Sequence, residues 1–156
     1  MVNANYTSEN NPGTSSVLTF PSSYFHVKID NMSVAFKEVS GLQIETEVFE
    51  YREGGVNDQI HRFPGPSKSG NVVLKRGIVA TQDFLKWYEK IVNGNIEYQH
   101  ADIGLYQIGN DSPIIIWRLT DAWPCKWSGP NFVAGDNVVA IETLELAHAG
   151  LTLGKK

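Results

Sequence analysis

Cysteine is almost absent from this sequence of 156 residues, in which Cys125 is the single example. One thiol excludes an intrachain disulfide and a thiolate metal cluster, and this usage is typical of synthesis in a reducing compartment. Basic residues are also few, with 13 Lys and Arg against 17 Asp and Glu and a formal net charge of -4. The charge therefore indicates no specific nucleic-acid site, because such proteins usually carry a basic patch.

Long apolar runs are missing as well. No run approaches the roughly 18 apolar residues that a membrane helix requires. The first 16 residues are polar and lack the apolar centre of a secretory signal. We therefore expect no membrane span and no export by a signal peptide.

The sequence also lacks a recognisable catalytic or metal-binding arrangement. Cys125 has Lys126 beside it, but neighbours in a strand point to opposite faces, so we expect a packed thiol rather than a nucleophile. Glu45 and Glu47 fit a solvated strand face better than a catalytic carboxylate pair. The four histidines are not at helical ligand spacing: His26, His61, His100 and His148. We predict no enzyme, no catalytic residue, no metal and no cofactor.

What the sequence does contain is a long stretch with a period of two. Leu42, Ile44, Thr46 and Val48 alternate with Gln43, Glu45 and Glu47, which predicts a strand from Leu42 to about Arg52 with one apolar and one polar face. A second strand, Asn71 to Arg76, follows a loop over residues 53–70 that is rich in Gly, Pro and Ser. We expect these two strands to form an antiparallel pair with a large flexible connection, since a loop this long is usually either functional or disordered.

The remaining pattern favours a mainly β protein with a single helix. Thr81 to Asn93 has helical periodicity, with Thr81 as the expected cap. The segment around Pro124 reads as an edge strand or a bulge. The last strand, Asn137 to Ala149, changes parity, which predicts a bulge near Glu142 or burial of both faces. With seven or eight strands, we expect a β-barrel or packed sheets over residues 21–156, preceded by a flexible arm over residues 1–20.

Several predicted strands are apolar on both faces, which is unusual for a small monomeric barrel. Ile114 to Leu119, Val72 to Leu74 and Val138 to Leu146 belong to this class. Part of that surface is therefore expected to meet other copies of the chain. Open strand edges favour such pairing, which closes into a ring or continues as a filament.

The sequence resembles the inner tail-tube proteins of contractile phage tails and of phage-tail-like extracellular contractile injection systems. The similarity rests on FHVKID, FKEVSGLQIETEVFEYREGG, RFPGPSKSGNVVLKRG, the WYEKI helix, WRLTDAWPCKW and VAIETLELAHAGL, which occur in this order from Phe25 to about Leu153. It implies packed, roughly orthogonal antiparallel sheets, barrel-like, with one flanking α-helix. The secretion tube protein of the type VI system is a more distant relative of the same design.

This resemblance also implies the partners and the setting. Hexameric rings of the chain would stack into a hollow tube, surrounded by a contractile sheath and joined to baseplate and spike hub proteins, with possible protein cargo in the lumen. The chain would be made in the bacterial cytoplasm and become part of a phage tail or of a particle that can be released from the cell.

Two sets of residues are candidates for tube functions. Gln43, Glu45 and Glu47 are expected to line the lumen, although an outer-wall position remains open. The expected subunit interface comprises Tyr51, Arg52, Asp58, Arg62 and Phe63. The alternatives to a structural tube subunit are a monomeric small-ligand-binding β-barrel with an apolar cavity and, less in keeping with the residues, an enzyme.

Overall fold

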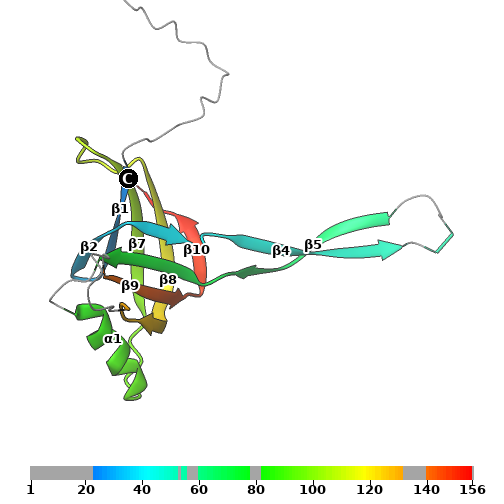
Figure 1. Ribbon diagram of the computed structural model, residues 1–156. Helices are drawn as coiled ribbons and strands as arrows, with labels where there is room; N and C mark the ends of the chain where they lie inside the picture. The colour runs from blue at the N-terminus through cyan, green and yellow to red at the C-terminus, as the bar shows by residue number, and fades with distance from the viewer. Residues whose placement is uncertain (1–22, 53, 56–59, 78–81, 132–139, 156) are drawn as a thin grey trace, which may run out of the picture.

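The computed structural model describes residues 23–52, 54–55, 60–77, 82–131 and 140–155. A barrel-like body carries one helix at one end and a long two-stranded ribbon that projects from its side (Figure 1). The elements in chain order are β1 (Ser23–Ile29), β2 (Met32–Phe36), β3 (Glu38–Ser40), β4 (Ile44–Arg52), β5 (Ile60–Ser69), β6 (Val72–Gly77), α1 (Asp83–Val92), β7 (Gln99–Gln107), β8 (Ile115–Ser128), β9 (Ile141–Ala147) and β10 (Gly150–Leu153).

Two parts of the chain, the segment β2–β3 and the strand β8, continue from one sheet into the next and so give the body its barrel form. The hydrogen-bonded order is β2-β1-β7-β8-β9-β6-β3, with β10 also on β8. β2 and β3 are separated by Lys37 alone, whose backbone N–H donates to the carbonyl oxygen of Lys75 at 3.0 Å. β8 pairs with β7 over its first half and with β9 over its second. The predicted mainly β fold of antiparallel sheets with one helix is confirmed.

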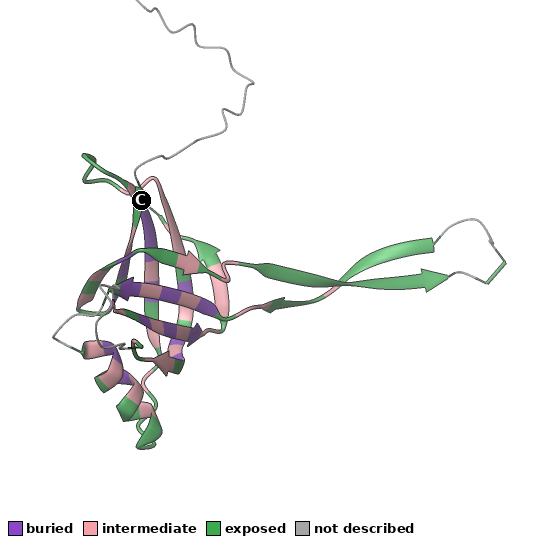
Figure 2. Cartoon of the chain, in the orientation of Figure 1, coloured by how far each residue is buried: buried purple, intermediate pink, exposed green. Residues whose placement is uncertain are grey.

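Buried residues alternate with more exposed ones along the barrel strands (Figure 2). The period of two places every second residue inward. The innermost side chains, each at most 1 % exposed, are Val27, Ile29, Val72, Leu74, Ile103, Leu119, Leu144 and Leu146. A barrel packed in this way has a solid core, not an internal ligand chamber.

Helix α1 buries Phe84 and Trp87 against one end of the barrel. Phe84 contacts Phe36 of β2, with ring centroids 5.6 Å apart. The helix begins at Asp83, one residue later than a cap at Thr81 predicts. Gln82 precedes it in a left-handed conformation (φ 48°) and makes no side-chain capping hydrogen bond. Thr81, the predicted cap, lies outside the described residues.

The predicted partner of the long strand is wrong. β4 does not pair with the strand after the loop; it pairs with β5, which occupies most of the predicted loop. Pro64 and Pro66 concealed this strand, because proline is disfavoured in central strands but is tolerated where one edge of the strand is free. The register also shifts opposite Glu47, so the alternation in β5 changes parity.

The predicted bulge near Glu142 is also wrong. β9 pairs with β6 in continuous register from Ile141 to Leu146, with Leu144 and Leu146 inward. The irregularity lies on the partner strand, between Pro124 and Lys126 of β8, which confirms the prediction made for Pro124. The parity of the apolar residues changes because Ile141 lies on the outward, exposed face of the strand, whereas Leu144 and Leu146 point inward. The predicted start of the strand at Asn137 lies outside the described residues.

Candidate self-assembly surfaces

The β4–β5 ribbon leaves the barrel through a tight passage at Gly41. Gly41 has φ +83°, and a Cβ atom there would lie 2.1 Å from the carbonyl oxygen of Asn71, so only glycine fits. Beyond this point, β4 and β5 pair with each other and with no other described strand. Gly41 thus forms the base of the ribbon.

Cross-strand pairs hold the ribbon together over its length. Thr46 and Ser67 share a side-chain hydrogen bond of 2.7 Å. Lys68 forms an ion pair with Glu47, and Arg62 forms one with Glu50 at 2.9 Å. These pairs are all exposed, so each adds little stability in water. They fix the register of the ribbon more than they stabilise it.

One face of the outer ribbon is aromatic. Phe49 lies opposite Phe63, and Tyr51 lies opposite His61, on the same face of the paired strands. The rings of His61 and Phe63 are stacked, with centroids 6.4 Å apart. Towards the base, the same face carries Glu45, Glu47 and Lys68. The face therefore changes from charged near the barrel to aromatic farther out.

The ribbon is exposed along most of its length in the single chain (Figure 2), and it carries several large apolar residues. Their exposed fractions are 56 % for Ile44, 65 % for Val48, 61 % for Phe49, 52 % for Tyr51, 44 % for Ile60 and 52 % for Phe63. An isolated two-stranded ribbon is marginally stable in water. Phe49, Tyr51 and Phe63 lie on one face of the ribbon, and Ile44, Val48 and Ile60 lie on the other. Exposed apolar groups on both faces indicate an interaction site.

Two strand edges of the barrel are also open. In the sheet order β2-β1-β7-β8-β10, the outer strands β2 and β10 each pair with a single described strand, β1 and β8 respectively. Their other edges carry backbone donors and acceptors available for another chain. Such edges on opposite sides of one sheet allow head-to-tail association.

The outward face of this sheet is polar. Asp102 of β7 binds the Arg118 guanidinium of β8 through two hydrogen bonds of 2.6 Å. The hydrogen bond and charge of Asp102 raise the pKa of Arg118 above its ordinary value. On β1, Tyr24 stacks on Tyr106 with centroids 5.5 Å apart. A wall of this composition is suited to contact with water.

Four of the five predicted interface residues lie on the β4–β5 ribbon. Tyr51 and Arg52 lie on β4, and Arg62 and Phe63 lie on β5. Asp58 lies outside the described residues. The predicted lumen residues Gln43, Glu45 and Glu47 are exposed at the base and inner part of the same ribbon.

Sequence reasoning missed other residues of these surfaces. Phe49, Ile60 and His61 were not selected, nor was the open edge of β10. For Phe49, the signal was present, since a Phe on the polar side of an alternating strand indicates an exposed apolar contact. For Ile60 and His61 on β5, the sequence showed no strand signal, because the register shift and the two prolines interrupt the alternation of apolar and polar residues.

The described residues offer little for catalysis or metal binding. They contain no group of three or more His, Cys, Asp or Glu side chains arranged to hold a metal ion. The thiol of Cys125 is half-buried and donates to the carbonyl oxygen of Glu145 at 3.4 Å. Burial, followed by the charge of Glu145, raises the pKa of this thiol. Such a shift disfavours the nucleophilic thiolate. Among the described helices, none has the length and apolar character needed to cross a bilayer.

Comparisons with solved structures give the same fold in tube proteins. A chain of "Cryo-EM Structure of an Extracellular Contractile Injection System, PVC sheath-tube complex in extended state" is 26 % identical, with a TM-score of 0.77, covering 87 % of this chain and 91 % of that chain. The sheath/tube terminator of the same kind of system is 25 % identical, with a TM-score of 0.78 and coverages of 90 % and 100 %. Hcp1 from Flavobacterium johnsoniae is 11 % identical, with a TM-score of 0.57 and coverages of 84 % and 94 %, and shares the fold alone.

Sequence comparison identifies the family. No curated protein matches the chain. The family model described as "T4-like virus tail tube protein gp19" matches residues 21–152, which include the barrel, the helix and the ribbon. The chain therefore belongs to the T4-like virus tail tube protein gp19 family.

Proposed function

We propose that copies of this chain form hexameric rings that stack into the hollow inner tube of a contractile, phage-tail-like injection particle. The observation that carries this proposal is the exposed apolar ribbon, which has no partner strand outside itself among the described elements. Family membership supports a tube. The chain would act mechanically, without turnover, and its packed core leaves no specific support for a ligand-binding monomer.

Within a ring, the open edges of β2 and β10 are suited to pairing between neighbours. Four successive antiparallel pairings separate these strands in the sheet, so β2 and β10 run in the same direction. Rotation about a ring axis would place them side by side as a parallel pair. A heterologous contact of this kind closes into a ring when the rotation per subunit fits.

The ribbon would lie on a neighbouring copy. Phe49, Tyr51 and Phe63 would lose their solvent exposure there, and Arg52 and Arg62, on the opposite face of the ribbon, would complete the proposed interface. Aromatic and Arg side chains are common anchors of protein interfaces. Near the ribbon base, the exposed Gln43, Glu45 and Glu47 remain our proposed lumen lining, where carboxylates would keep the passage hydrated and available for protein cargo.

The external partners follow from the structural neighbours. The similar chains at 25–26 % identity come from a sheath-tube complex, a sheath/tube terminator and a baseplate. We infer equivalent partners here, namely a contractile sheath around the tube and a baseplate with a spike hub at one end. The particle would act outside the cell that makes it.

Removing the aromatic anchors of the ribbon tests the proposal. Phe49→Ser with Phe63→Ser should leave the barrel folded but prevent assembly, as measured by sedimentation and negative-stain electron microscopy. Ile141→Ser is the matched control, because Ile141 is also exposed but lies on the barrel, and it should assemble normally. Normal tubes from the double variant would contradict the role of the ribbon, and a wild-type chain that stays monomeric at high concentration would contradict tube formation.

A further inference from the structure

A small hollow in the barrel surface lies beside a buried arginine, Arg76. Its volume is about 100 Å³, and its lining comes from the segment around the start of β3, from the end of β6 and from the start of β9. One ordered water molecule occupies about 30 Å³, so a single water would leave most of the hollow empty. The lining residues are Lys37, Glu38, Lys75, Arg76, Gly77 and Ile141.

The guanidinium of Arg76 retains an unpaired donor at this hollow. Arg76 is 4 % exposed, and its Nε donates to Glu142. The rings of Phe36 and Phe84 lie beside the guanidinium, with centroids 5.8 Å and 4.3 Å from its central carbon. Nη2 is buried and has no hydrogen-bond partner among the described residues. An unsatisfied donor on a buried charged group is unfavourable, so an acceptor from a ligand or from solvent is expected beside it.

The charges around this hollow leave one positive charge in excess. Lys75 pairs with Glu38 at 2.7 Å, and Arg76 pairs with Glu142. Lys37 is exposed and has no ion-pair partner within the described part of the chain. A neutral water would satisfy Nη2 but would not balance the extra charge. A monovalent anion would supply the acceptor and balance the charge, and charge-assisted hydrogen bonds are stronger than neutral ones.

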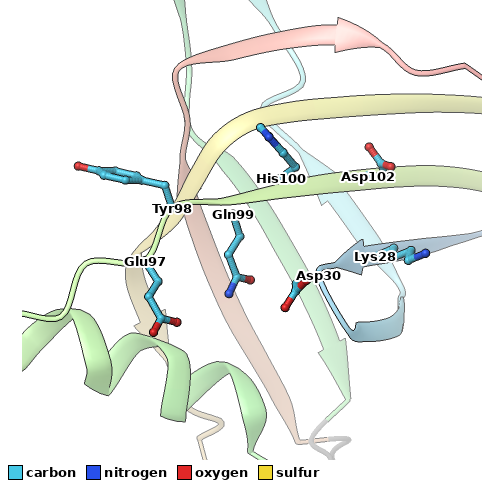
Figure 3. A pocket seen from close by; sticks show the side chains of 7 residues that line it. All are labelled: Lys28, Asp30, Glu97, Tyr98, Gln99, His100 and Asp102. Atoms are coloured by element: carbon cyan, nitrogen blue, oxygen red, sulfur yellow. The ribbon is translucent and has the colours of Figure 1, made fainter.

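A larger hollow on the barrel is less suited to an anion. Its volume is about 520 Å³, and side chains at the end of β1 and around the start of β7 border it (Figure 3). Its lining contains one lysine, Lys28, against the carboxylates of Asp30, Glu97 and Asp102. Two of these carboxylates have ion-pair partners outside the lining, and counting those partners brings the local charge to zero. The larger hollow therefore has no excess positive charge to attract an anion.

We propose that the hollow at Arg76 binds one small monocarboxylate of about the size of acetate. One carboxylate oxygen accepts from Arg76 Nη2, and the other accepts from Lys37 Nζ. The short alkyl part lies against Gly77 and Ile141, which give the hollow an apolar wall. The ligand stabilises the folded chain, because the unfolded chain does not bring these residues together. The site belongs to a single chain, so its occupation does not depend on the proposed tube.

Acetate binding to the full-length chain tests the site. Calorimetric titration with sodium acetate, at pH 7 and constant ionic strength, should give one site per chain. Acetate at ten times the dissociation constant should raise the melting temperature by about 3–6 °C relative to chloride. Equal melting temperatures in acetate and chloride, together with no heat of binding, would overturn the inference, since water alone would then fill the hollow.

Matched lysine substitutions locate the acetate. Lys37→Gln should weaken acetate binding about tenfold, because one charge-assisted hydrogen bond is lost. Lys37 is chosen because any replacement of Arg76 would leave Glu142 buried without its partner. Lys28→Gln, which removes an exposed lysine from the larger hollow, should leave the affinity unchanged. General effects of salt act on all three chains alike. Equal affinities of wild type and Lys37→Gln, or a loss of affinity in Lys28→Gln, would place acetate elsewhere and overturn the inference.

Discussion

Arg76 and Glu142 form an ion pair inside the barrel, beside helix α1. Arg76 is 4 % exposed and Glu142 5 %. The indole N–H of Trp127 donates to Glu142 Oε2 at 3.3 Å, and the Arg76 guanidinium lies 4.3 Å from the Phe84 ring centroid. The pair thus joins β6, β8 and β9 to the helix. Its two charges are 66 residues apart in sequence, so no local pattern predicts them as partners.

Glu142→Ala should reduce the free energy of unfolding by about 3–5 kcal/mol, because it leaves the Arg76 charge buried without its partner. The matched control is Glu38→Ala, which removes the exposed partner of Lys75, 2.7 Å away. An exposed pair contributes about 0–1 kcal/mol. Urea unfolding followed by tryptophan fluorescence measures both. Equal losses from the two variants would show that burial of Arg76 and Glu142 has no special consequence.

Cys125 should react slowly with maleimide at pH 8. Burial and the Glu145 carboxylate raise the pKa of its thiol, so the folded protein holds less thiolate than the unfolded chain. By linkage, the stability associated with the neutral thiol is present below the unfolded pKa and is lost as pH rises through the higher folded pKa. The measurement is the labelling rate with and without urea. Equal rates in the two states would contradict the raised pKa.

The elements differ in how clearly the sequence encodes them. Alternation identified β4 because its apolar and polar residues alternate along the first half of the strand, and helical periodicity identified α1, which buries Phe84 and Trp87. β5 was missed, since Pro64, Pro66 and a register shift remove its alternation. The pairing of β4 was then misassigned, because pairing depends on where the ribbon turns rather than on either strand alone. The self-assembly surface was therefore only partly predictable.

The ribbon should be dispensable for folding and necessary for assembly. Replacing residues 48–64 by Asn-Gly, a two-residue turn suited to antiparallel strands, removes the outer ribbon. Since β4 and β5 pair only with each other among the described strands, the melting temperature of the barrel should not change. Calorimetry and sedimentation measure the two properties. A lower melting temperature would reveal support of the barrel by the ribbon, and tubes from the shortened chain would contradict its role in assembly.

At the scale of the whole molecule, the single chain has several surfaces that are suited to association with other copies. Its ribbon exposes apolar groups, and two strand edges are open. Each feature would be unfavourable in a monomer, and a stacked ring satisfies both together. The packed barrel supplies a rigid body from which these surfaces project. Family membership in the tail tube proteins agrees with these surfaces, and both support the proposed assembly.

Cryo-electron microscopy of the concentrated full-length protein is the most direct test of this account. We predict hollow tubes of stacked sixfold rings, with β2 of one copy beside β10 of the next and the aromatic face of each ribbon covered by a neighbour. Particles that remain single chains at every concentration would contradict the account. Rings whose ribbons remain free in solvent would contradict it as well.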